Sequence, residues 1–165
     1  MASDHVRDAG SELGLDDQAY QSAVHDFEAA AAAVLGINLT DLRCLEILRQ
    51  QETALPGGLG AALGLTTGSV TAMLDRLEAL GYLTRTRDSA DRRKVIVRAT
   101  PLATQRVWDE IYRPLSEDGL AALAHYSDAE RAVVRDYLRR GRELYERQRA
   151  RLRDRRPDAG GAAAN

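Results

Sequence analysis

The stretch of sequence that decides the fold is residues 64–81, which read GLTTGSVTAMLDRLEALG. Apolar side chains recur in it three and four residues apart, the spacing that gathers side chains on one buried face of an α-helix. They are Val70, Met73, Leu74, Leu77 and Leu80. Thr66 is a suitable N-cap because its hydroxyl can accept a backbone N–H, and Gly81 is a suitable end because glycine tolerates a left-handed backbone. The stretch therefore predicts an amphipathic helix of about 14 residues with both ends marked.

The exposed side of this predicted helix consists of small side chains near its N-terminus. They are Thr67, Gly68, Ser69, Thr71 and Ala72. Small residues let a helix backbone approach a partner closely, and the free N–H groups and positive dipole end of a helix N-terminus favour a phosphate. A capped amphipathic helix is more often simply packed against a core. The sequence that follows decides between these two interpretations.

A basic β-hairpin is predicted directly after the helix. Residues 82–87 and 94–99 each alternate in side-chain character with the period of two that is typical of a strand, and residues 88–91 are turn formers. Between positions 85 and 98, six basic residues stand against two acidic ones, a local charge of +4. Most charge runs are solvated faces, but this one adjoins a capped helix with a slim N-terminus. Helix and hairpin together indicate a winged helix-turn-helix that binds DNA.

These motifs resemble those of the MarR family of bacterial transcriptional regulators. The resemblance is carried by LGLT at 63–66, GSVT at 68–71, LDRLE at 74–78, GYL at 81–83, Arg85, DRR at 91–93 and Thr100, and the helical layout is similar over residues 16–153. It implies a homodimer that binds a palindromic operator and is released by a small ligand or by oxidation. Residues 57–60, GGLG, depart from the family's bulkier pattern, so we expect a short or loosely held first helix of the helix-turn-helix.

The resemblance assigns roles to individual residues. The recognition helix would span about residues 67–80, with groove and phosphate contacts from Thr67, Ser69, Thr71, Ala72 and Arg76. Ser and Thr can donate or accept in the major groove, and the long arginine can bond a guanine bidentately. In the hairpin, or wing, the candidates are Arg85, Arg87, Asp91, Arg92, Arg93 and Lys94. Arg92 and Arg93 resemble the tip arginines, one of which enters the minor groove. Asp91 would hold an arginine in aim, or would simply close the turn.

The expected fold class is mostly α with a small β-wing. We expect a flexible tail over 1–15, an N-terminal helix of a dimerisation region over 16–37, a winged helix-turn-helix DNA-binding lobe over 38–100, C-terminal dimerisation helices over 101–156, and a disordered tail over 157–165. The terminal helices carry more apolar stripe than one lobe can cover, which favours a homodimer. A two-fold dimer would require an inverted-repeat operator with half-site centres about 10 bp apart.

Local signals mark several further helix boundaries. Gly36 should end the N-terminal helix, and Thr40 should cap the second one. Thr100 followed by proline is a helix start. Pro114 predicts a kink or break, and SDAE at 127–130 is a capping box that begins the last helix.

Charge and composition are compatible with a DNA-binding protein of about one domain. The net charge is −2, but residues 1–60, 61–100 and 101–165 carry −7, +3 and +2, so the positive charge is local. No apolar run approaches the roughly 18 residues of a membrane span, and no signal peptide begins the chain. We therefore expect a cytoplasmic protein without a membrane partner.

The sequence indicates a binding protein rather than an enzyme. His5, His25 and His125 are scattered, and no serine elbow, phosphate loop or nucleotide fingerprint is present. We therefore expect no catalytic residue, cofactor or metal site.

Two features are candidates for regulation. Phe27, Trp108 and Tyr112 could line an effector pocket for a small aromatic ligand, as the family resemblance implies, or could be core or dimer residues. Cys44, the single cysteine, could sense redox state or be a buried, inert thiol. Beside a ligand-released repressor, two alternatives stay open: a redox-sensing regulator, and a winged-helix dimer that binds proteins without binding DNA.

Overall fold

The computed structural model describes the backbone of residues 2–153 and the side chains of residues 11–152. Its helices accompany one two-stranded antiparallel sheet, so the predicted class, mostly α with a small β-wing, is confirmed. The chain divides into two compact units, Met1–Leu115 and Ser116–Asn165, which are described separately.

The first helix is longer than predicted. α1 runs from Ala2 to Leu35 and ends at Gly36, whose φ of +69° is the left-handed conformation expected there. Residues 2–15, for which the sequence predicts a flexible tail, continue this helix. Those residues include no proline that would stop a helix, and the two glycines in them each cost only about 1 kcal/mol.

The second helix starts earlier than predicted because another residue caps it. α2 spans Leu39–Gln51, and its N-cap is Asn38 rather than Thr40. The Asn38 Oδ1 accepts the Asp41 N–H at 2.9 Å, and the Asp41 carboxylate accepts the Asn38 N–H at 3.2 Å. This reciprocal capping box satisfies two backbone N–H groups at once, so Thr40 lies inside the first turn.

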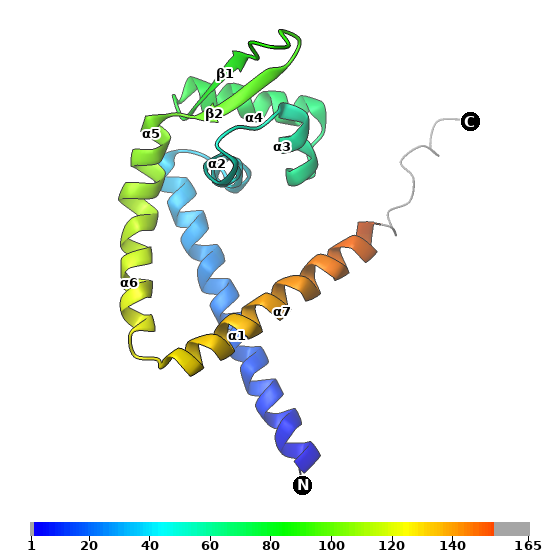
Figure 1. Cartoon of the computed structure of the whole chain (residues 1–165), viewed down its shortest axis with the longest axis vertical. Coiled ribbons are helices and arrows are strands. Elements are labelled where there is room, and N and C mark those ends of the chain that lie inside the picture. The colour runs from blue at the N-terminus through cyan, green and yellow to red at the C-terminus, as the bar shows by residue number, and fades with distance from the viewer. Residues whose placement is uncertain (1, 154–165) are drawn as a thin grey trace, which may run out of the picture. The chain divides into compact units, whose positions relative to one another are not determined.

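The helix-turn-helix and the wing follow in the predicted order. α3 spans Pro56–Leu63, α4 spans Thr67–Ala79, and β1 (Leu83–Arg87) pairs with β2 (Val95–Ala99), with Leu83 opposite Ala99. Ala54 adds a bridge to the outer side of β2 that the sequence did not predict, exchanging two backbone hydrogen bonds of 3.0 and 2.8 Å with Val97. In Figure 1 the sheet lies beside α3 and α4, and its hairpin end projects away from the helices.

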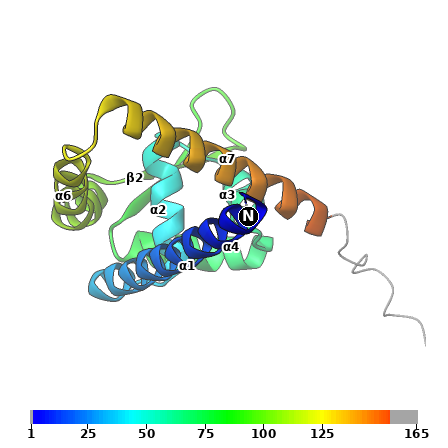
Figure 2. The same cartoon turned by 90° about the horizontal axis from the view of Figure 1, so that it is seen from below.

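The core of the first unit forms where α2, α3, α4 and the sheet meet. Its least exposed side chains come from each of these elements and from η1, and include Cys44, Leu59, Leu77, Val97 and Val107, all with 0% exposure. α2 is seen end-on in Figure 1 and lengthwise in Figure 2, where it meets α1. Of the predicted recognition-helix stripe, only Leu80 leaves the core: it is 42% exposed because the helix ends at Ala79.

A composite helix follows the sheet. It consists of α5 (Pro101–Ala103), a π-helical segment η1 (Thr104–Tyr112) and α6 (Arg113–Leu123). The Thr100 hydroxyl accepts the Ala103 N–H at 3.2 Å, which confirms the predicted cap. The helix does not end at Pro114. The departure from α-helical hydrogen bonding comes before it, in η1, where carbonyls bond five residues ahead.

The second unit contains the rest of α6 and α7 (Asp128–Arg153). Its capping box is confirmed, with Ser127 N–H donating to Glu130 Oε2 at 2.8 Å and Glu130 N–H donating to Ser127 Oγ at 3.3 Å. No side chain among residues 116–152 is buried. The tail predicted over 157–165 lies outside the described residues.

Candidate nucleic-acid interface

α4 has the ends that the sequence predicted. Thr66 is the N-cap, and its Oγ1 accepts the Ser69 N–H at 3.3 Å. At the other end Gly81 has a φ of +77°, and its N–H donates to the Glu78 carbonyl at 2.9 Å. These local bonds fix where α4 begins and ends, and the buried stripe of Val70, Met73 and Leu77 fixes which face it turns outward.

α3 and α4 have the geometry of a helix-turn-helix. Their axes are bent by 109° across a three-residue connection that begins at Gly64, whose φ is +69°. Gly60 lets the two helices approach closely, because a Cβ at this position would lie 3.0 Å from the Val70 Cγ2. The glycine-rich α3, expected to be short or loose, is an eight-residue helix with Leu59 and Gly60 buried.

The small residues predicted to meet a groove lie together on the open side of α4. Thr67, Ser69, Thr71 and Ala72 are all exposed. The Ser69 hydroxyl bonds the Thr66 hydroxyl at 2.9 Å, and the Thr71 hydroxyl donates to the Thr67 carbonyl at 3.1 Å. A hydroxyl has one donor and two acceptor sites, so each retains capacity for an outside partner.

Arg76, predicted as the long-reaching contact, has a partner inside the chain. Its Nε donates to Asp41 Oδ2 at 2.8 Å and its Nη2 donates to Asp41 Oδ1 at 2.6 Å, while the arginine side chain stays 44% exposed. Asp41 is fully buried. Sequence reasoning missed this aspartate, although its place on the apolar stripe of α2, three residues before Cys44 and four before Leu45, was a signal that it needs a partner.

Arg85, predicted as a wing contact, links β1 to α4. Its guanidinium bonds Glu78 Oε2 at 2.9 Å through Nε and pairs with Asp75 at 2.7 Å, and its backbone N–H donates to Glu78 Oε1 at 3.0 Å. The arginine side chain is 28% exposed. Hydrogen bonding from Arg85 lowers the pKa of Glu78. The local charge of +4 predicted for the hairpin includes Arg85, although the carboxylates of Asp75 and Glu78 compensate its charge.

The wing tip is held by its own polar groups. The Asp88 carboxylate accepts the N–H groups of Ala90 and Asp91 at 2.7 and 3.1 Å, which lowers its pKa. Arg87 Nη1 donates to the Arg92 carbonyl at 2.9 Å. These bonds close the turn and leave the Arg92 and Lys94 side chains exposed.

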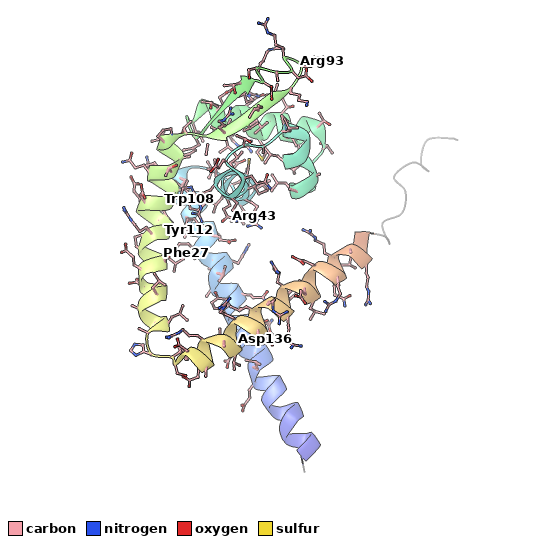
Figure 3. The ribbon with its side chains drawn as sticks, viewed as in Figure 1. Phe27, Arg43, Arg93, Trp108, Tyr112 and Asp136 are labelled. Carbon is pink, nitrogen blue, oxygen red and sulfur yellow. The ribbon has the colours of Figure 1, made fainter. Side chains whose placement is uncertain are left out.

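Asp91 bonds both the backbone and the side chain of one arginine. Its Oδ1 accepts the Arg93 N–H at 3.1 Å, which shapes the turn, and also the Arg93 Nε–H at 3.3 Å. The Arg93 side chain is 94% exposed, and Figure 3 shows it extending outward from the hairpin tip.

The three aromatic residues predicted to line a pocket do come together. The ring centroids of Phe27 and Tyr112 are 5.7 Å apart, and those of Trp108 and Tyr112 are 4.9 Å apart (Figure 3). The Tyr112 hydroxyl donates to Glu46 at 3.0 Å, and burial with this carboxylate raises the pKa of Tyr112. Arg49 stacks over Trp108 at 4.4 Å. The rings contact one another, and all three residues are partly buried.

Cys44 lies in the core, three residues after Asp41 on α2. Its exposure is 0%, and burial, with a smaller effect of the Asp41 carboxylate, raises its pKa to about 12. Since the thiolate is the reactive form, this environment favours the inert thiol over the redox sensor.

Among the described residues, no group of three or more His, Cys, Asp and Glu side chains could hold a metal ion. No single helix there has the length and apolar composition to cross a membrane, and only the bent α3–α4 pair passes on those two criteria.

Solved structures share the fold. Wild-type MarR of E. coli superposes with a TM-score of 0.57 at 21% identity, covering 78% of this chain and 94% of that one. S. aureus MepR in complex with DNA superposes with a TM-score of 0.58 at 17% identity, covering 78% and 96%. At these identities the likeness shows the fold alone.

Sequence comparison identifies the family. The model of the MarR family matches residues 37–95, which span α2, α3, α4 and the hairpin. The HTH-type transcriptional regulator YcgE of Bacillus subtilis (strain 168) is 37% identical over 128 residues, which are 77% of this chain and 82% of the relative. The chain therefore belongs to the MarR family of transcriptional regulators.

Proposed function

We propose that this regulator binds double-stranded DNA sequence-specifically, with α4 in the major groove and the wing beside it. The observation that carries the proposal is the exposed face of α4, made only of small residues over its first turns, next to a cationic hairpin tip. A helix with slim side chains can bring its backbone close to base edges. The cations beside it would bind phosphates.

Within this interface, base reading falls to the first two turns of α4. Thr67, Ser69 and Thr71 offer hydroxyls, and Ala72 offers a methyl group that suits a thymine methyl. At the wing tip, Arg92, Arg93 and Lys94 would contact the backbone or enter the minor groove, where a narrow A·T-rich segment concentrates negative potential. The bond from Arg93 Nε to Asp91 supports this role because it restricts the directions in which the arginine can point.

We further propose a homodimer on an inverted-repeat operator. Apolar side chains are exposed along α1 and throughout residues 116–152: Leu13, Leu15, Tyr20, Leu120, Leu123, Val133, Val134, Tyr137 and Leu138 are each at least 41% exposed. A second copy of the chain would remove this surface from water. A two-fold dimer places its recognition helices about one DNA turn apart, so half-site centres should be about 10 bp apart.

The regulator would act as a repressor that a small aromatic ligand releases. Phe27, Trp108 and Tyr112 are the candidate ligand contacts, and a ligand bound among them would have to separate rings that now touch. A thermal-shift screen of small aromatic acids tests this part, because a ligand that binds the folded state raises its melting temperature. Phe27→Ala should abolish the shift if the cluster is the site.

Selection of genomic DNA fragments by the purified protein, followed by sequencing, tests the proposal as a whole. We expect an enriched inverted repeat with half-sites about 10 bp apart. Sedimentation of the complex with a selected duplex should give two chains per duplex. Absence of any enriched sequence, with the protein folded, would refute DNA reading and favour the alternative of a wing that binds proteins.

A further inference from the structure

The recognition helix is held from two directions by ion pairs. From α2, Asp41 binds Arg76 through both carboxylate oxygens, at 2.8 and 2.6 Å. From β1, Arg85 binds Asp75 and Glu78. Residues two positions apart in an α-helix point about 200° apart, so Arg76 and Glu78 lie on opposite flanks of the exposed face of α4. The two sets of ion pairs therefore hold the helix on both flanks of that face.

The Asp41 carboxylate is held in position by its own helix as well as by Arg76. Oδ2 also accepts the Asn38 N–H in the capping box, so the first turn of α2 sets the orientation of the carboxylate. α2 itself is anchored by Leu42, Leu45 and Leu48, each no more than 2% exposed. A bidentate arginine–carboxylate pair constrains both distance and plane, unlike a single contact. The pair thus ties α4 rigidly to the core through α2.

We propose that Asp41 and Arg76 are positioning residues for DNA reading. Their bidentate pair sets the rotation of α4 so that Thr67, Ser69, Thr71 and Ala72 meet the base edges in register, and Arg76 itself reads no base. This inference rests on the proposed function. Ser69 lies seven residues before Arg76, on the same side of the helix, so a rotation that releases Arg76 also turns the reading hydroxyl.

A double-mutant cycle on the full-length protein tests the inference. The variants are Asp41→Asn, Arg76→Gln and the double variant, and the probes are a duplex that the wild type enriches from a random pool and the same duplex with its sequence shuffled. Each single variant should lower the affinity ratio of the two duplexes by about tenfold or more. The double variant should be no less selective than the singles, because both remove the same contact.

The base-by-base profile separates positioning from reading. Rotation of α4 should weaken preference at several base pairs of a half-site together. A loss confined to one base pair in Arg76→Gln, with selectivity intact in Asp41→Asn, would show that Arg76 reads a base and would overturn the inference. Lower thermal stability with an unchanged affinity ratio would also overturn it, because the pair would then be structural only.

Two further variants keep the test decisive. If Arg76→Gln fails to fold, Arg76→Lys replaces it in the test. Lysine keeps the positive charge but lacks the forked guanidinium that binds both carboxylate oxygens, so this variant should fold and still lose several-fold in selectivity. The control is Arg113→Gln, which removes an exposed pair with Asp109, 3.9 Å apart, and should leave selectivity unchanged. If the wild type enriches no duplex, the proposed function and this inference both fail. If it does, and the Arg76→Lys and Asp41→Asn variants stay selective, only this inference fails.

Discussion

The close approach of α3 and α4 predicts opposite outcomes for two glycine-to-alanine substitutions in one helix. At Gly58, a Cβ would meet nothing within 4 Å. At Gly60, it would meet the Val70 Cγ2 at 3.0 Å and the Leu65 carbonyl oxygen at 3.4 Å. Gly58→Ala is therefore a matched control for Gly60→Ala, since both change the same helix by the same atoms.

The magnitudes follow from two opposing terms. Alanine in place of glycine stabilises a helix position by about 0.5–1 kcal/mol, largely by restricting the unfolded chain. Overpacking a core costs about 1–3 kcal/mol. Val70 is 4% exposed and β-branched, with a single favoured rotamer in a helix, so it has little room to yield. Gly58→Ala should gain up to about 1 kcal/mol, and Gly60→Ala should lose up to about 2 kcal/mol.

Urea unfolding followed by circular dichroism measures both free energies. The variants must be compared at one protein concentration, because the stability of a dimer depends on it. The expected gap between them is about 1–3 kcal/mol, which corresponds to several degrees in melting temperature. A Gly60→Ala protein as stable as Gly58→Ala would show that α3 and α4 do not require the close approach.

Three further predictions concern charge and reactivity. Because Arg85 lowers the pKa of Glu78, the stability that this pair contributes is present at neutral pH and is lost as the pH falls through the lowered pKa. On acidification, the melting temperature of Glu78→Gln should therefore fall less than that of the wild type. Parallel curves of melting temperature against pH would contradict this. Cys44 should resist iodoacetamide in the folded protein at neutral pH and react after unfolding in urea, as measured by mass spectrometry. Labelling of the folded protein would instead favour the redox-sensing regulator. In mobility-shift titrations, Arg93→Ala should weaken binding to all duplexes and reduce the slope of log affinity against log salt concentration by about one. Ser69→Ala should instead change which sequences are preferred. Unchanged titrations for both variants would refute both contact assignments.

The parts of the fold that the sequence predicted well depend on short-range contacts. The caps at Thr66, Thr100 and Ser127 each bond a residue three positions ahead, so a short motif contains both partners. The hairpin follows from alternation within two short strands. The cap of α2 was missed because Asn38 and Thr40 are both good N-caps, and only the acid at position 41 distinguishes them.

The parts that the sequence could not predict depend on contacts between distant residues. Asp41 and Arg76 are 35 positions apart. A charged residue on an apolar stripe indicates that it has a partner, but the sequence does not identify which residue the partner is. The bridge from Ala54 to β2 uses backbone atoms alone, which leave no side-chain pattern. η1 is similar: its π-helical bonding depends on how the helix packs, and no residue type in it requires that geometry.

The same long-range contacts change which basic residues of the hairpin are available to bind DNA. A count of +4 treats every cation in it as available to DNA, but the cations of α4 and the hairpin have different roles. Arg76 and Arg85 are compensated by carboxylates of the chain itself and hold α4 to α2 and to β1. Arg87 uses its guanidinium to support the carbonyl of Arg92. The exposed charge that could attract a polyanion is therefore carried by the hairpin from Arg87 to Lys94 and by Arg98 of β2, so the position of Arg92 and Arg93 relative to α4 matters more for binding than the total charge of the region.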